Sequence, residues 1–222
     1  MATIINIDSS LETASVSIAT DGIIKKHLTN EVQKQHASFI HVAIQSLLTD
    51  VQINITDIDA IACTVGPGSY TGLRVGLAAA KGICYALDKP LLTINTLHAM
   101  AHAVYIKQEK NISLYYCPMI DARRMEVYTA LYEQDLKEIT PAHAVVVDEN
   151  FCDRPLKERD VIFCGNGMQK FKKLCISKQA LFEETGDIYS SVNILSYRKY
   201  LAKEFANLAM EVPLYAKEFY NP

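Results

Sequence analysis

The glycine-rich segment of residues 66–76, GPGSYTGLRVG, has the composition of a loop that could bind phosphate. It precedes a helical pattern, and the free N–H groups at the start of a helix attract anions. The phosphate loop of ATPases, however, has the pattern GxxxxGK followed by Ser or Thr, whereas here Gly72 is followed by Leu73 and Arg74. The sequence therefore favours a tight turn with a capped helix over a phosphate site.

Two histidines at a spacing of four, His98 and His102, could point from one face of a helix toward a metal ion. Two ligands do not make a metal site, and the glutamate of the HExxH motif is absent. His36 and His41 are five positions apart, so their side chains would diverge by about 140° on a helix. We therefore expect no metal site, and interpret His98 and His102 as packing or surface residues.

No candidate nucleophile lies in a known catalytic motif, since the GxSxG elbow is absent and Ser69 is placed to cap a helix. Six cysteines are scattered without CxxC spacing, and several lie in apolar stretches: Cys63, Cys84, Cys117, Cys152, Cys164 and Cys175. This distribution indicates reduced thiols in the interior, not a disulfide framework or a zinc site.

The composition excludes several classes of protein. Half of the 222 residues are hydrophobic and 21% are charged, which is typical of a soluble globular chain. A formal charge of −3 argues against a free-standing nucleic-acid-binding protein, which needs a basic face for phosphates. The first residues lack the basic start of a signal sequence, and no apolar run approaches the roughly 20 residues of a membrane span. We expect a cytoplasmic protein without a membrane segment.

The first half of the chain alternates strand and helix patterns, compatible with one α/β layer. Apolar and β-branched runs predict the strands, one hairpin turn at Asp21-Gly22 joins two of them, and apolar residues at helical spacing predict the helices. The predicted strands are 3–8, 13–19, 23–24, 58–65 and 91–94, and the predicted helices are 36–48, 70–87 and 96–105.

The polar stretch 107–111 suggests a boundary, so we expect an N-terminal lobe of residues 1–105 and a C-terminal lobe of residues 106–222. The C-terminal lobe partly repeats the order of strand, turn and strand seen in the first. Its predicted strands are 112–120, 125–132 and 161–164, and its predicted helices are 168–174 and 194–209.

The helix predicted over residues 70–87 has more apolar surface than one sheet can cover. Its strongly polar positions, Arg74 and Lys81, lie together on the helical wheel, whereas a surface helix needs only one apolar stripe. The surplus must contact either another helix of the same lobe or a second chain. The residues expected at a contact with a second chain are Ile40, Ile44, Gly72, Leu73, Gly76, Leu77, Ala79, Ala80 and Ile83.

Five separate motifs together resemble those of the TsaB (YeaZ) family. The segment GPGSYTGLR at 66–74 is highly specific, and INIDSS at 5–10, KPL at 89–91, IDAR at 120–123 and PLY at 213–215 extend the resemblance over nearly the whole chain. The resemblance implies an α/β fold of the actin-like (ASKHA, RNase H-like) type with two lobes. It also implies a role in forming threonylcarbamoyladenosine at position 37 of tRNA.

In that family this subunit is needed for the modification but does not transfer the group. The resemblance therefore implies a TsaD-like catalytic paralogue and a TsaE-like ATPase as partners, contact with tRNA only through the complex, and a homodimer when the chain is alone. Because the family associates through helices of the N-terminal lobe, the resemblance favours the second chain as the cover of the surplus surface. We expect Gly76→Arg or Ala80→Arg to abolish association while the monomer stays folded.

The nucleotide site of the actin-like superfamily is only partly present. Asp8 and Asp121 stand at the expected strand ends, but neither is followed by the glycine turn that lets backbone N–H groups approach phosphate. Gly165 and Gly167 form the one possible nucleotide-side turn. We interpret these four residues as remnants of a degenerate site, and expect no catalytic residue and no bound cofactor.

Two enzyme functions remain as alternatives. An ATP-dependent phosphotransferase of actin-like fold would need the glycine turns that are missing, and a metallopeptidase would need a third metal ligand that the sequence does not offer. The residues and the resemblance together favour a protein-binding, non-catalytic subunit.

Overall fold

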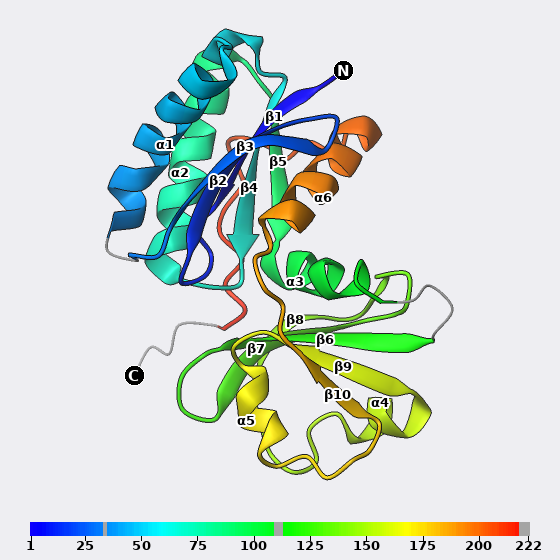
Figure 1. Ribbon diagram of the computed structural model, residues 1–222. Coiled ribbons are helices and arrows are strands. Elements are labelled where there is room, and N and C mark those ends of the chain that lie inside the picture. Colours follow the sequence, from blue (N-terminus) through cyan, green and yellow to red (C-terminus); the bar gives the residue numbers. More distant parts are fainter. Residues whose placement is uncertain (33–34, 109–112, 218–222) are drawn as a thin grey trace. The chain divides into compact units, whose positions relative to one another are not determined.

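The computed structural model describes residues 1–32, 35–108 and 113–217 (Figure 1). The chain forms two compact units: unit 1 contains Met1–Thr96 and Tyr189–Leu214, and unit 2 contains Leu97–Ile188 and the residues from Tyr215 onward. This division differs from the predicted boundary after residue 105. The stretch 109–112, which includes part of that boundary and the first residue of a predicted strand, lies outside the described residues.

Unit 1 is built on a mixed sheet with the strand order β3-β2-β1-β4-β5. The strands are β1 (Thr3–Asp8), β2 (Ala14–Thr20), β3 (Ile23–Asn30), β4 (Ala60–Gly66) and β5 (Leu91–Asn95). Strand β1 is antiparallel to β2 and parallel to β4, so Ile5 pairs with Ile18 on one side and with Ile61 on the other. The predicted strands and the hairpin of this half are confirmed.

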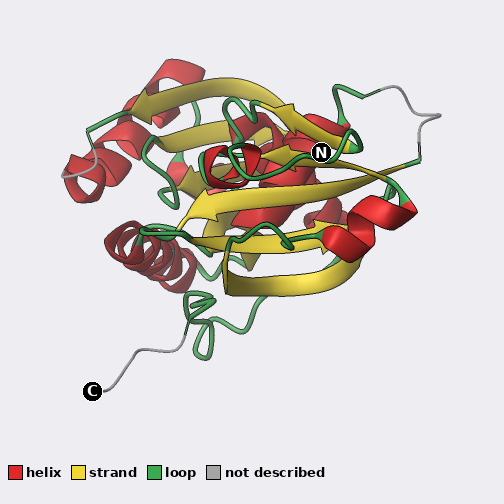
Figure 2. Cartoon of the chain, turned by 90° about the horizontal axis from the view of Figure 1, so that it is seen from below, coloured by secondary structure: helices red, strands yellow, loops and turns green. Residues whose placement is uncertain are grey.

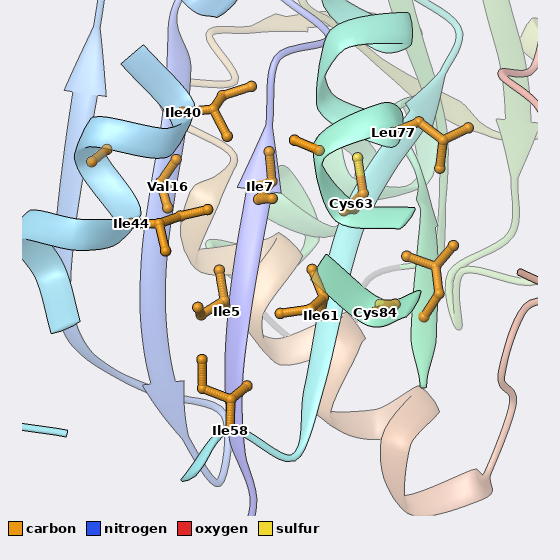
Figure 3. Packing of buried hydrophobic residues seen from close by; sticks show 14 of the residues in the cluster. Ile5, Ile7, Val16, Ile40, Ile44, Ile58, Ile61, Cys63, Leu77 and Cys84 are labelled. Carbon is orange, nitrogen blue, oxygen red and sulfur yellow. The ribbon is translucent and has the colours of Figure 1, made fainter. Parts of the chain in front are cut away.

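Helices cover the two faces of this sheet, which explains why β1 and β4 are buried at nearly every position. The helices are α1 (His36–Val51), α2 (Tyr70–Leu87) and α6 (Tyr189–Ala202), and a short 3-10 turn, η2, spans Ile55–Asp57. Ile7 and Cys63 belong to the core beneath α1 and α2, shown in Figure 3, whereas Ile4 and Ala62 pack with the tyrosines of α6. Side chains at successive strand positions thus serve opposite faces.

The last helix differs from its prediction, because it spans Tyr189–Ala202 rather than 194–209 and packs on the sheet of unit 1. Its buried positions include Ser191, Asn193 and Ser196, which apolar periodicity cannot detect. The helix ends before Lys203, whose φ of 56° is left-handed, and the following segment is held at Leu91 by an isolated bridge with Ala206.

Unit 2 has a second mixed sheet, with the order β10-β9-β6-β7-β8, whose strands are labelled in Figure 1. Figure 2 shows the strands of the chain in yellow from a second direction. The strands of unit 2 are β6 (Leu114–Asp121), β7 (Glu126–Tyr132), β8 (Glu138–Val146), β9 (Asp160–Cys164) and β10 (Ala180–Glu183). Its helices are α3 (Thr96–Tyr105), α4 (Asp153–Glu158) and α5 (Met168–Lys172). The predicted strands β6, β7 and β9 and the helices α3 and α5 are confirmed, whereas β8, α4 and β10 were not predicted.

Candidate protein interface

The start of α2 is fixed to the turn that follows β1. The hydroxyl of Ser69 accepts a hydrogen bond from the N–H of Gly72 at 3.3 Å, as expected for a helix cap. The N–H of Ser69 donates to the carbonyl oxygen of Ser10 at 2.7 Å, and the hydroxyl of Ser9 donates to the carbonyl oxygen of Gly72 at 2.8 Å. The predicted tight turn with a capped helix is confirmed.

The glycines of this segment allow the same close packing. A Cβ atom on Gly72 would collide with the carbonyl oxygen of Ser9, and one on Gly76 would collide with the Ser9 hydroxyl. The glycine-rich motif therefore lets α2 pack closely against the turn that follows β1. Its backbone contacts protein atoms at the place where a phosphate loop would leave room for an anion.

Eight of the nine residues predicted to meet a second chain are buried within unit 1. Ile40 and Ile44 of α1 and Leu77 of α2 point into the core above the sheet in Figure 3. The buried residues of the predicted set are Ile40, Ile44, Gly72, Leu73, Gly76, Leu77, Ala79 and Ala80, and Ile83 is half-buried. The small-residue face is thus the inner face of the helix, and a bulky charge at Gly76 or Ala80 would disrupt unit 1 rather than leave the monomer folded.

The outer face of α2 also consists of small and apolar residues. Ala78, Gly82 and Ala86 follow one another at a spacing of four and are exposed, and Ile83 and Val75 flank them. Together with α1 they border an open groove of about 540 Å³. The groove is lined by Ala37, His41, Ile55, Val75, Ala78, Ala79, Gly82, Ile83, Ala86 and Leu87.

A second groove, of about 590 Å³, adjoins the first along α1 and η2, since the two share His41, Ile55 and Ile83. It is more polar, because its lining includes Gln45, Asn54 and other amide and hydroxyl side chains. The full lining is His41, Ile44, Gln45, Leu48, Thr49, Gln52, Ile53, Asn54, Ile55 and Ile83. We call the surface formed by the two grooves the α1/α2 face.

Gly82 is a residue of this face at which no packing contact within unit 1 requires glycine. A Cβ atom there would have no described atom within 4 Å. Glycine inside a helix costs about 1 kcal/mol relative to alanine. Sequence reasoning missed Ala78, Gly82 and Ala86. Their spacing of four residues was a readable signal, and their positions on the helical wheel separate them from the face of Gly72 and Gly76.

The charged residues of α2 are engaged outside the grooves. The Arg74 guanidinium lies 4.2 Å from the centre of the Tyr70 ring, and the Lys81 ammonium donates to the carbonyl oxygens of Ala209 and Glu211. Among the residues lining the grooves, His41 is the one with an ionisable side chain. The lining of the α1/α2 face therefore contains no Asp, Glu, Lys or Arg side chain, which suits packing against an apolar protein surface and offers no lysine or arginine for phosphate.

Asp8, one of the predicted remnants of a nucleotide site, is buried in unit 1 with its carboxylate engaged. Its Oδ1 atom accepts hydrogen bonds from the N–H of Ser10 at 3.0 Å, the hydroxyl of Ser10 at 2.6 Å and the hydroxyl of Thr64 at 2.7 Å. The bonded residues belong to β1, to the turn after it and to β4, so the Asp8 carboxylate links these three segments in the interior of unit 1. The carboxylate thereby holds the turn that follows β1.

The remnants in unit 2 also have partners. The Asp121 carboxylate accepts hydrogen bonds of 2.6 Å from the Lys170 ammonium and from the N–H of Arg123, and these lower the pKa of Asp121 despite partial burial. Gly165 has a φ of 93°, and a Cβ atom there or on Gly167 would collide with the backbone around Met119. A lysine of the chain itself thus forms an ion pair with the Asp121 carboxylate.

The histidine pair on α3 packs in unit 2. His98 stacks on Tyr132 with ring centres 5.4 Å apart, and His102 is buried beside Tyr105. Within residues 1–32, 35–108 and 113–217 no three His, Cys, Asp or Glu side chains are grouped to hold a metal ion. None of the helices described there is long and apolar enough to span a membrane.

Comparison with known proteins gives a consistent family. The family model described as TsaD, tRNA N6-adenosine threonylcarbamoyltransferase, matches residues 23–212. A protein of Bacillus subtilis (strain 168) named tRNA threonylcarbamoyladenosine biosynthesis protein TsaB is 29% identical over 175 residues, which are 78% of this chain and 74% of that protein. The protein of the same name from Escherichia coli (strain K12) is 35% identical over 60% of this chain, but the match covers only 55% of its length.

Among solved structures, YeaZ from Pseudomonas aeruginosa superposes with a TM-score of 0.79 at 21% identity. The match covers 97% of this chain and all of that one. At this identity the likeness concerns the fold, and it agrees with the predicted actin-like α/β architecture of two lobes, each with a mixed sheet.

Proposed function

The chain belongs to the TsaB (YeaZ) family, within the larger group that the TsaD family model describes, and from this membership we propose its function. It is a non-catalytic subunit of the assembly that transfers a threonylcarbamoyl group to N6 of adenosine 37 in tRNA. The proposal commits to a protein-binding role, with the transfer chemistry carried out by another chain.

The observation that carries the proposal is the open α1/α2 face, whose first groove is lined mainly by apolar side chains and by the exposed Gly82. A helix without side-chain bulk at Ala78, Gly82 and Ala86 lets another helix approach closely. The partner that we assign to this face is the TsaD-like catalytic paralogue. The match of the TsaD model to this chain supports a paralogue of the same fold, whose own helix pair could pack against α1 and α2.

The remaining partners follow from the same arrangement. The chain alone forms a homodimer through the α1/α2 face, a TsaE-like ATPase joins the assembly, and tRNA is bound through the complex. The net charge of −3 supports this division, because a subunit that bound tRNA by itself would need a basic face. The internally engaged carboxylates of Asp8 and Asp121 support a non-catalytic role.

The test is to replace Gly82 with arginine and to measure binding of the TsaD-like paralogue together with formation of threonylcarbamoyladenosine in a reconstituted assembly. The buried charge and bulk should reduce binding by at least a hundredfold, equivalent to about 3 kcal/mol. Modified tRNA, quantified by nucleoside mass spectrometry, should fall in parallel. The free energy of unfolding of the monomer, measured at low protein concentration, should not fall, since the site is open in the monomer and arginine favours a helix more than glycine does.

The matched control is Ile176→Arg, which places the same side chain at a residue of unit 2 that is 99% exposed. It should leave binding and modification at wild-type levels. Normal binding by Gly82→Arg would refute the interface, and threonylcarbamoyl transfer by the isolated chain would refute the non-catalytic role.

A further inference from the structure

Unit 2 holds two thiols in direct contact, which the proposed function does not use. The Sγ atoms of Cys117 on β6 and Cys152 at the start of α4 are 4.0 Å apart, although the residues are 35 positions apart in the sequence. Cys117 belongs to the core of unit 2, and Cys152 and Cys175 pack against that core. A disulfide bond is about 2 Å long, so the two sulfur atoms need to approach by roughly another 2 Å.

The two thiols differ in their access to solvent. Cys117 lies inside the sheet and is 1% exposed, with its Sγ atom 3.3 Å from the hydroxyl of Thr129. Cys152 is half-buried and is therefore the nearer of the two residues to solvent and to a small oxidant. One thiol is therefore placed to be oxidised first and the other to resolve the product from the protein interior.

The segment before α4 can supply the required movement. Cys152 has a left-handed backbone with a φ of 62°, a conformation that costs a non-glycine residue about 1 kcal/mol or more. The turn around it is held by short-range hydrogen bonds, from Phe151 N–H to the Asp148 carbonyl at 3.3 Å and from Asp153 N–H to the Asn150 carbonyl at 3.1 Å. By contrast, Cys117 is fixed between β7 and β9.

We propose that Cys117 and Cys152 form a reversible disulfide bond when the protein meets a peroxide. The Cys152 sulfur attacks one peroxide oxygen, the O–O bond breaks, and Cys152 becomes a sulfenic acid as one water leaves. The Cys117 thiol then attacks the Cys152 sulfur, the S–O bond breaks, and a second water carries away the hydroxyl group with the Cys117 proton. Two thiols lose two electrons in total, and hydrogen peroxide accepts them.

The electrostatic surroundings set the rate of this reaction. The hydrogen bond with Cys117, burial, and the neighbours Cys175 and Asp153 all raise the pKa of Cys152. Thiolate is the nucleophile, so it is scarce at neutral pH and the pair reacts under sustained peroxide exposure, not with traces. Because the raised pKa keeps Cys152 protonated, a higher pH increases the fraction of thiolate and makes oxidation faster.

The test uses the full chain, reduced and then exposed to hydrogen peroxide at neutral and mildly alkaline pH. Intact mass should fall by two hydrogen atoms, peptide mapping should identify a link between Cys117 and Cys152, and dithiothreitol should restore the starting mass. The midpoint of thermal unfolding should rise on oxidation, because the bond restrains the unfolded chain.

Three variants make the assignment specific. Cys152→Ser and Cys117→Ala should each abolish the loss of two hydrogens, whereas Cys175→Ser should retain it. Because Cys117 is buried, the Cys152 variant carries the test if the other fails to fold. A link from Cys152 to Cys175, a sulfinic acid without any disulfide, or no reaction would each overturn the proposal.

Discussion

The side-chain amide of Asn6 in β1 donates a hydrogen bond of 2.8 Å to the amide oxygen of Asn193 in α6, across 187 positions of sequence. The Asn193 amide in turn donates to the hydroxyl of Ser17 at 2.8 Å and to the carbonyl oxygen of Tyr189 at 2.6 Å. All three polar side chains are buried. This group ties the last helix to the first two strands, and so explains how a helix of low apolar content is held on the sheet of unit 1.

Replacing Asn193 with alanine should lower the free energy of unfolding by about 2 kcal/mol, because it leaves the buried amide of Asn6 and the hydroxyl of Ser17 short of partners. Urea denaturation followed by circular dichroism measures the change. The control is Ser46→Ala, at an exposed position of α1 that lines neither groove, which should change stability by less than about 0.5 kcal/mol. Equal stability of the two variants would mean that the polar group does not hold α6.

Two glycines of α2 should respond to alanine in opposite directions. Gly76→Ala should destabilise unit 1 by about 1 to 3 kcal/mol, because the added methyl group displaces the Ser9 hydroxyl from its buried bond to Gly72. Gly82→Ala should stabilise the monomer by up to about 1 kcal/mol, since its site is open and alanine favours the helix.

Each glycine is thus the control for the other, with the same substitution in the same helix. Unfolding measured at low protein concentration separates monomer stability from association. The extra methyl group of Gly82→Ala should also weaken binding through the α1/α2 face. If Gly82→Ala proved as destabilising as Gly76→Ala, the outer face would have to be packed within the monomer.

The orientation of α2 marks the limit of reasoning from the sequence. The wheel of the helix indicated more apolar surface than one sheet can cover but left its cover open. The family resemblance favoured a second chain at Gly72, Gly76 and Ala80, which the structure buries in unit 1. Both faces of the helix are small and apolar, so hydrophobicity alone cannot tell which one meets the sheet. The decisive contacts are with Ser9, a residue more than 60 positions away, and such contacts are not readable from helical spacing.

The other differences have similar physical causes. Strands that lie between neighbours, such as β1 and β4, are rich in apolar residues and buried at nearly every position, and they were predicted within about two residues. Strand β8 is an edge strand with half-exposed side chains and Pro141, and β10 has four residues, so neither has a clear strand pattern. The sequence therefore revealed the central strands and most helices, while the edges and the position of α6 depend on tertiary contacts.

Lys81 should hold the segment that follows α6 onto unit 1. Its ammonium donates to the carbonyl oxygen of Glu211 at 3.0 Å and to that of Ala209 at 3.4 Å. Lys81→Met keeps most of the side chain's length but removes the donor, so amides of residues 207–212 should exchange with deuterium several-fold faster. Exchange in β1 should stay unchanged, and equal protection of the segment in both proteins would show that Lys81 does not anchor it.

The pair of Asp121 and Lys170 should make stability depend on pH in the acidic range. The Lys170 ammonium lowers the pKa of the folded Asp121 carboxyl below that of the unfolded chain, so the pair stabilises the fold above about pH 4 and loses its effect as pH falls through the lowered pKa. Lys170→Met should therefore be less stable than the wild type at pH 7, and the difference should shrink on acidification. Urea denaturation at a series of pH values measures it. The control is Lys178→Met, on the exposed surface of the same unit, which should show no such pH-dependent difference. A constant difference in stability between Lys170→Met and the wild type from pH 7 to pH 2 would contradict the assignment. The loss of stability would then come from packing or from the hydrogen bond to the Glu126 carbonyl.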